Sequence, residues 1–181
     1  LTGNRRNNII NAKDGDDTIF GRKGDDKIDS GNGNNVAYGG SGDDHIWAQS
    51  EEKNTENFLF GGSGNDFIWG GYSNDGFNHL AGGKGRDVIA IWGDDCEIYG
   101  GAGKDNLSVW GGLSTIDGGR GNDFIKTADG TATITGGAGS DTIKLKKTAD
   151  NVTITDFTVG EDRLKFGRYA KVTDSDLTIK A

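Results

Sequence analysis

Proline and methionine are absent from this 181-residue sequence, cysteine occurs once, and hydrophobic residues make up only 32% of it. The single cysteine, Cys96, excludes an internal disulfide framework. No apolar run is long enough to cross a membrane, and no charged and apolar leader opens the chain. Because the first residue is Leu1 and not methionine, we expect a fragment of a longer protein. So few apolar side chains would not fill two thick layers, which favours a thin, repetitive fold.

Sequence motifs for catalysis are also missing. The two histidines, His45 and His79, do not form a zinc-binding HExxH, and the chain has no GxSxG elbow, Walker loop or GxGxxG motif. Cys96 has no histidine near it in sequence, so a turn residue is favoured there over a nucleophile. We therefore predict a non-catalytic module, with any enzymatic or toxic activity carried elsewhere in a longer chain.

The charge of the chain is unevenly distributed. The formal net charge is −8, with +2 over residues 144–181 and −10 over residues 1–143. Glycine occurs 33 times in the whole chain. An acidic, glycine-rich body argues against nucleic-acid binding and favours a cation as the partner.

An aliphatic residue recurs every nine positions along most of the chain, which indicates an internal repeat. Two steps are longer, thirteen residues from Ile46 to Leu59 and twelve from Ile68 to Leu80, and they predict small loop insertions at Gln49–Glu56 and Tyr72–Phe77. The recurring residues are Ile19, Ile28, Ala37, Ile46, Leu59, Ile68, Leu80, Ile89, Ile98, Leu107, Ile116, Ile125, Ile134, Ile143 and Val152.

Each nonapeptide joins a glycine-rich half to a short half in which apolar and polar residues alternate, as in DFIK at 123–126. Alternation with period two is typical of a strand, and glycine permits the positive φ angles of tight turns. One such short strand cannot bury its aliphatic face alone, but stacked coils can share a narrow core. We predict an all-β fold, a right-handed parallel β-roll (β-solenoid) of two short-stranded parallel sheets with two nonapeptides per coil.

Alternate nonapeptides differ at their sixth position. In a coil of two units the two series lie on opposite edges, so only residues of one series can share a metal ion. One series always has aspartate there: Asp26, Asp44, Asp66, Asp87, Asp105, Asp123 and Asp141. The intervening series, which contains both insertions, has Asp17, Asn35, Asn57, Asn78, Cys96, Ser114, Ala132 and Asp150.

The aspartate series predicts a row of calcium ions. Calcium takes six to eight oxygen ligands, so two stacked turns must complete one shell with carboxylates and backbone carbonyls. Seven stacked aspartate turns leave room for up to six ions, while the opposite edge offers one weak candidate near Asp17 and Asn35. The alternative is that the aspartates are only turn residues. The candidate ligands are Asp26, Gly40, Gly42, Asp44, Gly62, Gly64, Asp66, Gly83, Gly85, Asp87, Gly101, Gly103, Asp105, Gly119, Gly121, Asp123, Gly137, Gly139 and Asp141.

The units GGRGNDFIK (118–126) and GGAGSDTIK (136–144) match the pattern GGxGxDxUx, where U is an aliphatic residue. In this respect the chain resembles the RTX family, the hemolysin-type calcium-binding repeats found towards the C-terminus of type I secreted proteins. The resemblance implies a module that folds on extracellular calcium and supports the secretion and stability of a larger secreted or cell-surface bacterial protein, such as an enzyme, adhesin or toxin. Residues 152–166 resemble the segment that ends such blocks, so we expect repeats over 1–151 and a capping segment over 152–181.

Aromatic residues occupy outward strand positions and leave a second function open. Trp47, Trp69, Trp92 and Trp110 form two pairs, and Phe20, Tyr38, Phe60 and Tyr99 form a column on the other sheet. Such rings can stack on sugars, which would make the chain a carbohydrate-binding module of a surface adhesin; ice binding is disfavoured, because the turns lack a regular Thr/Asn array. The rings can instead stiffen the sheets or pack against another domain. The basic residues Lys144, Lys146, Lys147, Arg163, Lys165, Arg168 and Lys171 predict either a polyanion site or a solvated cap.

Overall fold

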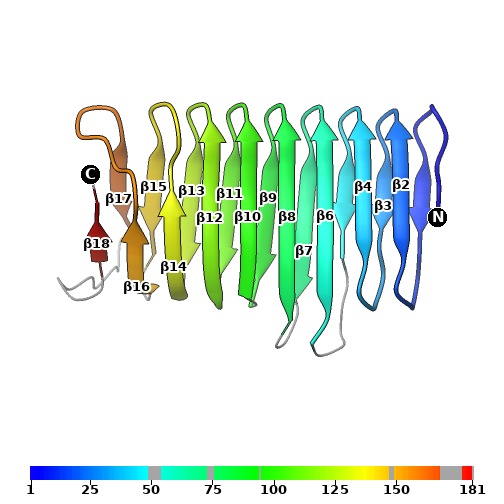
Figure 1. Cartoon of the computed structure of the whole chain (residues 1–181), viewed down its shortest axis with the longest axis horizontal. Coiled ribbons are helices and arrows are strands. Elements are labelled where there is room, and N and C mark those ends of the chain that lie inside the picture. Colours follow the sequence, from blue (N-terminus) through cyan, green and yellow to red (C-terminus); the bar gives the residue numbers. More distant parts are fainter. Residues whose placement is uncertain (49–53, 73–75, 94, 147–148, 168–176, 181) are drawn as a thin grey trace.

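The computed structural model describes residues 1–48, 54–72, 76–93, 95–146, 149–167 and 177–180. The chain folds into an elongated β-solenoid whose strands alternate between two nine-stranded sheets, with the two termini at opposite ends (Figure 1). The described residues contain no helix that could span a membrane. This architecture confirms the predicted all-β roll.

All strand pairs in both sheets are parallel, and each strand pairs with those one coil before and after it. Sheet A is formed by β2 (Thr18–Lys23), β4 (Val36–Ser41), β6 (Glu56–Ser63), β8 (Phe77–Lys84), β10 (Asp95–Ala102), β12 (Leu113–Arg120), β14 (Gly130–Thr135), β16 (Ala149–Ile154) and β18 (Leu177–Ile179). Sheet B is formed by β1 (Ile9–Asn11), β3 (Lys27–Asp29), β5 (His45–Trp47), β7 (Phe67–Tyr72), β9 (Val88–Trp92), β11 (Asn106–Trp110), β13 (Phe124–Ala128), β15 (Thr142–Leu145) and β17 (Arg163–Phe166).

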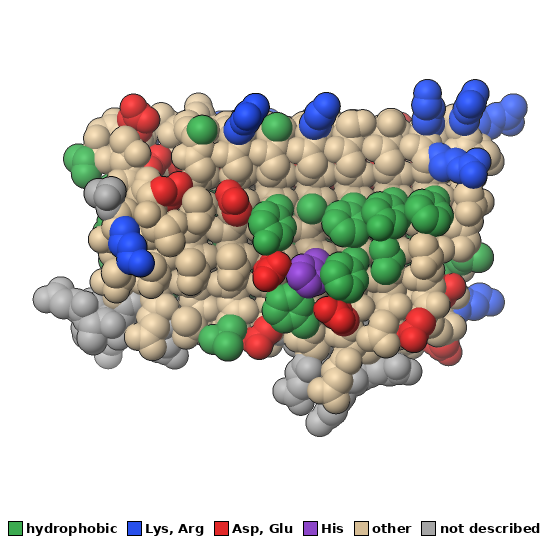
Figure 2. Space-filling model, viewed as in Figure 1, with side chains coloured by type: hydrophobic (Ala, Val, Ile, Leu, Met, Phe, Trp, Pro, Cys, Tyr) green, Lys and Arg blue, Asp and Glu red, His purple; other side chains and the backbone are tan. Residues whose placement is uncertain are grey.

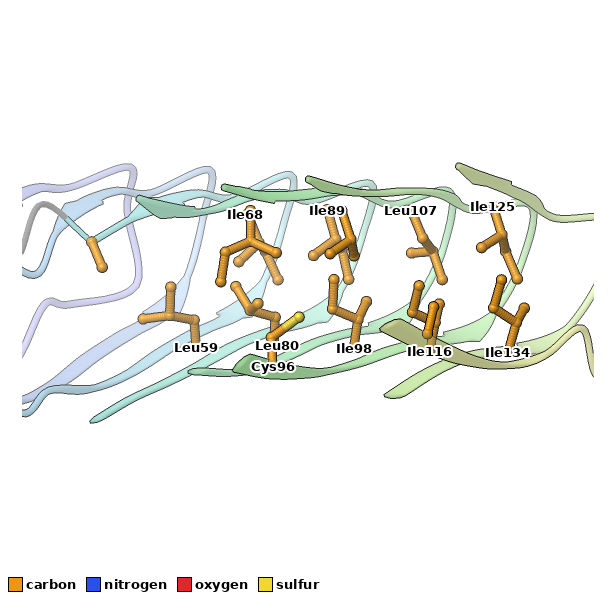
Figure 3. Packing of buried hydrophobic residues seen from close by; sticks show 14 of the residues in the cluster. Leu59, Ile68, Leu80, Ile89, Cys96, Ile98, Leu107, Ile116, Ile125 and Ile134 are labelled. Carbon is orange, nitrogen blue, oxygen red and sulfur yellow. The ribbon is translucent and has the colours of Figure 1, made fainter. Parts of the chain in front are cut away.

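The core is a narrow double row of aliphatic side chains between the sheets (Figure 3). Register partners such as Ile98 and Ile116 place equivalent residues of successive coils directly above one another. All fifteen residues predicted from the nine-residue recurrence are buried, with at most 1% of their surface exposed. The period therefore identified the core correctly, because each strand directs one aliphatic residue inward per nonapeptide.

The register changes between β14 and β16, near the C-terminal end, in addition to the irregularity between β7 and β9 at Trp69 and Tyr72. Val152 lies beside Ala132, whereas Ile154 continues the column of Ile134. The expected alignment of Val152 with Ile134 is therefore wrong, although Val152 is buried. The connection from β15 to β16 is two residues longer than the repeat requires, and this extra length shifts β16 along its neighbour.

Both predicted insertions lie in connections that run from sheet B to sheet A. One joins β5 to β6 and the other joins β7 to β8, and residues 49–53 and 73–75 of these connections lie outside the described residues. Figure 1 shows these connections along the lower edge, while the turns along the upper edge have similar lengths except for the longer connection from β16 to β17. Within the nonapeptide repeats, chain length therefore varies on one edge of the roll.

The roll continues beyond the last clear nonapeptide. Strands β16, β17 and β18 extend the two sheets, and β16 begins at Ala149. The predicted division between residues 1–151 and 152–181 thus falls within a strand, and it stays a prediction.

Candidate metal site

The seven aspartates of the predicted series all lie in the turns that run from sheet A to sheet B. We call this line of turns the aspartate edge; it is the upper edge in Figure 1. Each aspartate residue is buried, with at most 2% of its surface exposed. The structure therefore brings the predicted carboxylates into one row, one per coil.

Glycine is required in these turns because the backbones of successive coils approach closely. Gly103 has a φ of 151°, and a Cβ atom there would lie 1.5 Å from the carbonyl oxygen of Gly85. A Cβ atom on Gly39 would lie 2.4 Å from Oδ2 of Asp44. The glycines thus leave room for the carboxylates and bring backbone carbonyl oxygens of one coil against the next coil.

One oxygen of each carboxylate links neighbouring coils. The backbone N–H of Asp44 donates to Oδ1 of Asp66 at 2.8 Å, and this contact repeats from coil to coil. This series of hydrogen bonds ends at Asn8 and at Asp162. The backbone N–H of Asn8 donates to Oδ1 of Asp26, and Oδ1 of Asp162 accepts from the backbone N–H of Asp141. The intervening links join Asp26 to Asp44, Asp66 to Asp87, Asp87 to Asp105, Asp105 to Asp123 and Asp123 to Asp141, at 2.7–2.8 Å.

The second oxygen of each carboxylate has no hydrogen-bond partner. The Oδ2 atoms of all seven aspartates are buried and unpaired among the described residues. A buried polar atom without a partner costs about 1–3 kcal/mol, and more where it carries charge. Seven such oxygens at equivalent places, each next to glycine-rich backbone, fit a row of hard cations that accept carboxylate and carbonyl ligands.

The pKa values of these aspartates reflect the same burial. Burial raises the pKa of Asp66 and Asp123 to about 7 and that of Asp44 and Asp87 to about 6, although the amide bonded to each carboxylate lowers it. Neighbouring aspartates raise these four values further. The ionised row is therefore unfavourable unless a positive charge compensates it.

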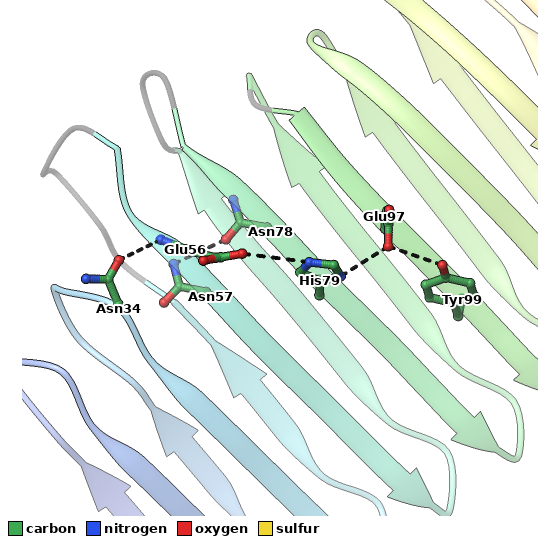
Figure 4. Close-up of polar contacts among 7 residues, drawn as sticks. All are labelled: Asn34, Glu56, Asn57, Asn78, His79, Glu97 and Tyr99. Carbon is green, nitrogen blue, oxygen red and sulfur yellow. Dashed lines mark hydrogen bonds and ion pairs between the residues drawn. The ribbon is translucent and has the colours of Figure 1, made fainter.

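On the edge on the other side of the roll, which we call the opposite edge, the asparagine side chains at the sixth position form hydrogen bonds within the edge. Asn35 Nδ2 donates to the carbonyl oxygens of Gly33 and Gly31 at 3.2 and 3.4 Å. Asn57 Nδ2 donates to Oδ1 of Asn78 at 3.2 Å (Figure 4). At the predicted weak site near Asn35, these carbonyl oxygens are already engaged by an amide.

Further along, the opposite edge becomes apolar. The equivalent positions are held by Cys96, Ser114, Ala132 and Val152, and all of these except Ser114 are buried in the hydrophobic cluster. Figure 3 shows Cys96 beside the aliphatic row. The Cys96 thiol is thus a core group, which argues against the nucleophile that the sequence left open.

No three side chains of His, Cys, Asp or Glu converge on one point within the parts of the chain that the structure describes. A cation at the aspartate edge must therefore use backbone carbonyls for most of its shell. The sequence leads to the same expectation, because each turn supplies a single carboxylate at the sixth position.

The row includes two residues that the sequence analysis did not identify. Asn8 occupies the sixth position of an additional N-terminal unit, and its side chain also donates to Asp26 at 2.7 Å. Asp162 occupies the equivalent position at the other end, with Gly160 and Leu164 at the fourth and eighth positions of its unit. The GxDxL spacing could have revealed Asp162, but the paired glycines that mark other units are missing there.

Three rings of the predicted aromatic column on sheet A form a stack, and Ala81 separates Tyr99 from Phe60. Phe20 and Tyr38 lie 5.2 Å apart at 4°, and Tyr38 and Phe60 lie 4.9 Å apart at 11° (Figure 2). Neighbouring rings thus cover each other's faces, so a sugar ring cannot stack on those faces. On this sheet the geometry favours the stiffening role.

The tryptophans lie on the outer face of sheet B in the two expected pairs. Trp47 and Trp69 are register partners, as are Trp92 and Trp110, whose rings are 5.1 Å apart at 43°. Trp92 is 41% exposed. Lys126 Nζ lies 4.3 Å above the ring of Trp110. A sugar-stacking role therefore stays a prediction for this face.

His79 forms a network on sheet A (Figure 4). Its Nδ1 lies 3.2 Å from Glu97 and its Nε2 3.9 Å from Glu56, while Phe58 stacks on the ring at 4.5 Å. The Tyr99 hydroxyl donates to Glu97 at 3.2 Å. Both nitrogens of His79 face carboxylates of the same surface, so the network is explained by contacts within the sheet.

Comparison with known proteins agrees with this geometry. A family model described as the RTX calcium-binding nonapeptide repeat matches four times, at residues 2–37, 30–50, 54–89 and 111–143. No curated protein and no solved structure matches the chain significantly. Residues 90–110, between the third and fourth matches, contain the end of β9 together with β10 and β11 of the same roll.

Proposed function

Because the chain belongs to the RTX family of calcium-binding nonapeptide repeats, we propose that it is a calcium-folded module of a larger secreted protein. Up to six calcium ions lie in one row along the aspartate edge, each between two successive coils. The carboxylates of the seven aspartates and the carbonyl groups of their glycine-rich turns supply the ligands.

The observation that carries this proposal is the row of seven buried Oδ2 atoms without hydrogen-bond partners. Turn residues alone would not explain it, because aspartates in ordinary turns bond to local amides or to water. The chemistry of the row is that of a hard cation, since each gap combines carboxylate oxygen with backbone carbonyls.

Calcium binding and folding are one event in this proposal. Without a cation the ionised row repels itself, and each short strand depends on its neighbours for burial. Extracellular calcium modules bind at about 10⁻⁴–10⁻³ M. At the far lower calcium concentration of the cytosol the chain stays unfolded, which suits passage through a type I secretion channel, and it folds outside the cell.

The test is a calcium titration of chelator-treated protein, followed by far-UV circular dichroism and tryptophan fluorescence together. We expect a cooperative transition from coil to β-structure near millimolar calcium and none with magnesium. Native mass spectrometry of the folded form counts the bound ions. A chain that is already folded in chelator, with no response to calcium, would leave the aspartates as turn residues and refute the proposal.

A further inference from the structure

Three lysines lie in one column on the outer face of sheet B, and we call them the lysine column. Lys126 of β13, Lys144 of β15 and Lys165 of β17 are direct register partners. Adjacent strands are about 4.8 Å apart, so the three side chains share a narrow strip. Arg163 and Lys146, each two residues from a column member, are exposed and add charge on the same side.

No acidic residue compensates this charge on the strands concerned. Strands β11, β13, β15 and β17 contain neither aspartate nor glutamate. Among the described residues, the ion pairs join His79 to glutamates of sheet A. The nearest carboxylates in sequence are those of Asp123, Asp141 and Asp162 on the aspartate edge, which accept from backbone amides, and that of Asp129 in the turn after β13.

The column therefore contains an uncompensated repulsion. Like charges directly opposite each other on neighbouring strands destabilise a sheet. Burial lowers the pKa of Lys126, and the charges of Lys146 and Lys144 lower it further. An anion along the strip would remove this cost.

An aromatic platform adjoins the column. Lys126 lies over the ring of Trp110, and Trp92, the neighbour of Trp110, is the more exposed of the two. The faces of these rings are tilted to each other and not parallel. An exposed indole beside a line of cations is suited to a ligand that combines flat sugar faces with negative charge.

We propose that this face of sheet B binds a linear anionic polysaccharide, with its carboxylate or sulfate groups on the lysine column and a sugar ring against Trp92. The column repeats at one strand spacing, which is comparable with the length of a pyranose unit in an extended chain. The acidic charge of residues 1–143 repels any polyanion from the rest of the roll and so confines the ligand to this strip. The proposal requires the folded roll but does not depend on how many calcium ions it binds.

The test is isothermal titration calorimetry of the calcium-treated full chain with heparin, a sulfated polymer, and hyaluronate, a carboxylated one, against neutral dextran. We expect binding to at least one polyanion, weakening with salt, and none to dextran. The triple variant K126Q/K144Q/K165Q should bind about tenfold more weakly or worse, because three charge-assisted contacts are lost. The variant W92A should weaken binding without changing the salt dependence.

The matched control is K23Q/K84Q/K104Q, which removes the same charge from the aspartate edge and should leave the affinity unchanged. Circular dichroism in calcium reports folding separately, and the first triple variant should melt no lower than the parent because a repulsion is removed. If both triple variants lost the same amount of affinity, the effect would be one of net charge, and the proposal would be overturned. So would tighter binding to single-stranded DNA than to either polysaccharide, or no binding to either by a folded chain.

Discussion

The two edges of the roll use the same turn position in opposite ways. On the aspartate edge, Asp66 accepts one amide through Oδ1 and leaves Oδ2 unpaired. On the opposite edge, Asn35 accepts an amide from Asp17 through Oδ1, and its Nδ2 donates to two glycine carbonyls. Aspartate leaves its Oδ2 and the turn carbonyls free for a cation, whereas asparagine has an NH₂ group in place of Oδ2 and donates to those carbonyls itself.

This difference also explains where the chain tolerates change. A row of shared cations requires the seven aspartate turns of this edge to keep the same length and register. The opposite edge depends only on contacts within each coil pair, so its residues vary from asparagine to Cys96, Ala132 and Val152, and its connections vary in length.

The largest expected effect comes from the substitution Gly103→Ala on the aspartate edge. The new Cβ would lie 1.5 Å from the carbonyl oxygen of Gly85, so the stacked turns must separate. We expect a loss of more than about 4 kcal/mol in the free energy of unfolding. Circular dichroism in about 10 mM calcium, well above extracellular dissociation constants, should show no cooperative folding.

Its control is Gly15→Ala near the opposite edge. Gly15 has a φ of 120°, but nothing lies within 4 Å of its Cβ position. Only the backbone strain of about 1–3 kcal/mol applies there. Equal losses at the two positions would contradict the view that close stacking limits the aspartate edge.

The substitution Asp87→Asn should destabilise the fold in calcium and stabilise it in chelator. At 100 times the dissociation constant, each lost ion removes about 2.7 kcal/mol of stability, and Asp87 adjoins two gaps of the row. In chelator the amide can donate to carbonyls as Asn35 does, so the variant should retain more β-structure than the parent. Urea unfolding with and without calcium measures both; a loss of equal size in chelator would refute the assigned role of Oδ2.

The reciprocal substitution, Asn57→Asp, should destabilise the opposite edge by about 1–3 kcal/mol, because a buried oxygen would face Oδ1 of Asn78 in place of a donor. We expect the same loss in calcium and in magnesium, measured by thermal unfolding. Recovery specific to calcium would show that this edge also accepts a cation.

The remaining prediction concerns pH. The folded pKa values of Asp66 and Asp123, about 7, lie above the usual value of 3.8, so the folded chain binds more protons than the unfolded chain between these limits. Without calcium, stability is therefore greatest at low pH and falls as pH rises through about 7. Calcium competes with these protons, so its midpoint concentration should be higher at pH 5.5 than at pH 8, in titrations of about the same ionic strength. A midpoint independent of pH would contradict the buried row.

The sequence predicted the fold well because one physical rule, an inward aliphatic residue in each short strand, repeats along the chain. It failed where length changed without a recognisable signal: two extra residues before β16 moved Val152 out of its expected column. Asp162 escaped notice because its unit lacks the paired glycines. The pairing of Lys126 with Lys144 follows from the nonapeptide spacing. The pairing of Lys144 with Lys165 does not, because β17 follows β15 after a longer connection.

The alternation of the chain between two sheets has a consequence for how such a protein can grow in evolution. Duplication of one nonapeptide would exchange the sheets for everything downstream and move later aspartates to the wrong edge. Duplication of two nonapeptides adds a complete coil, extends both sheets by one strand and adds one more position to the row. The heritable module is therefore the pair of repeats, and tandem duplication of that pair lengthens the protein without redesign of any residue.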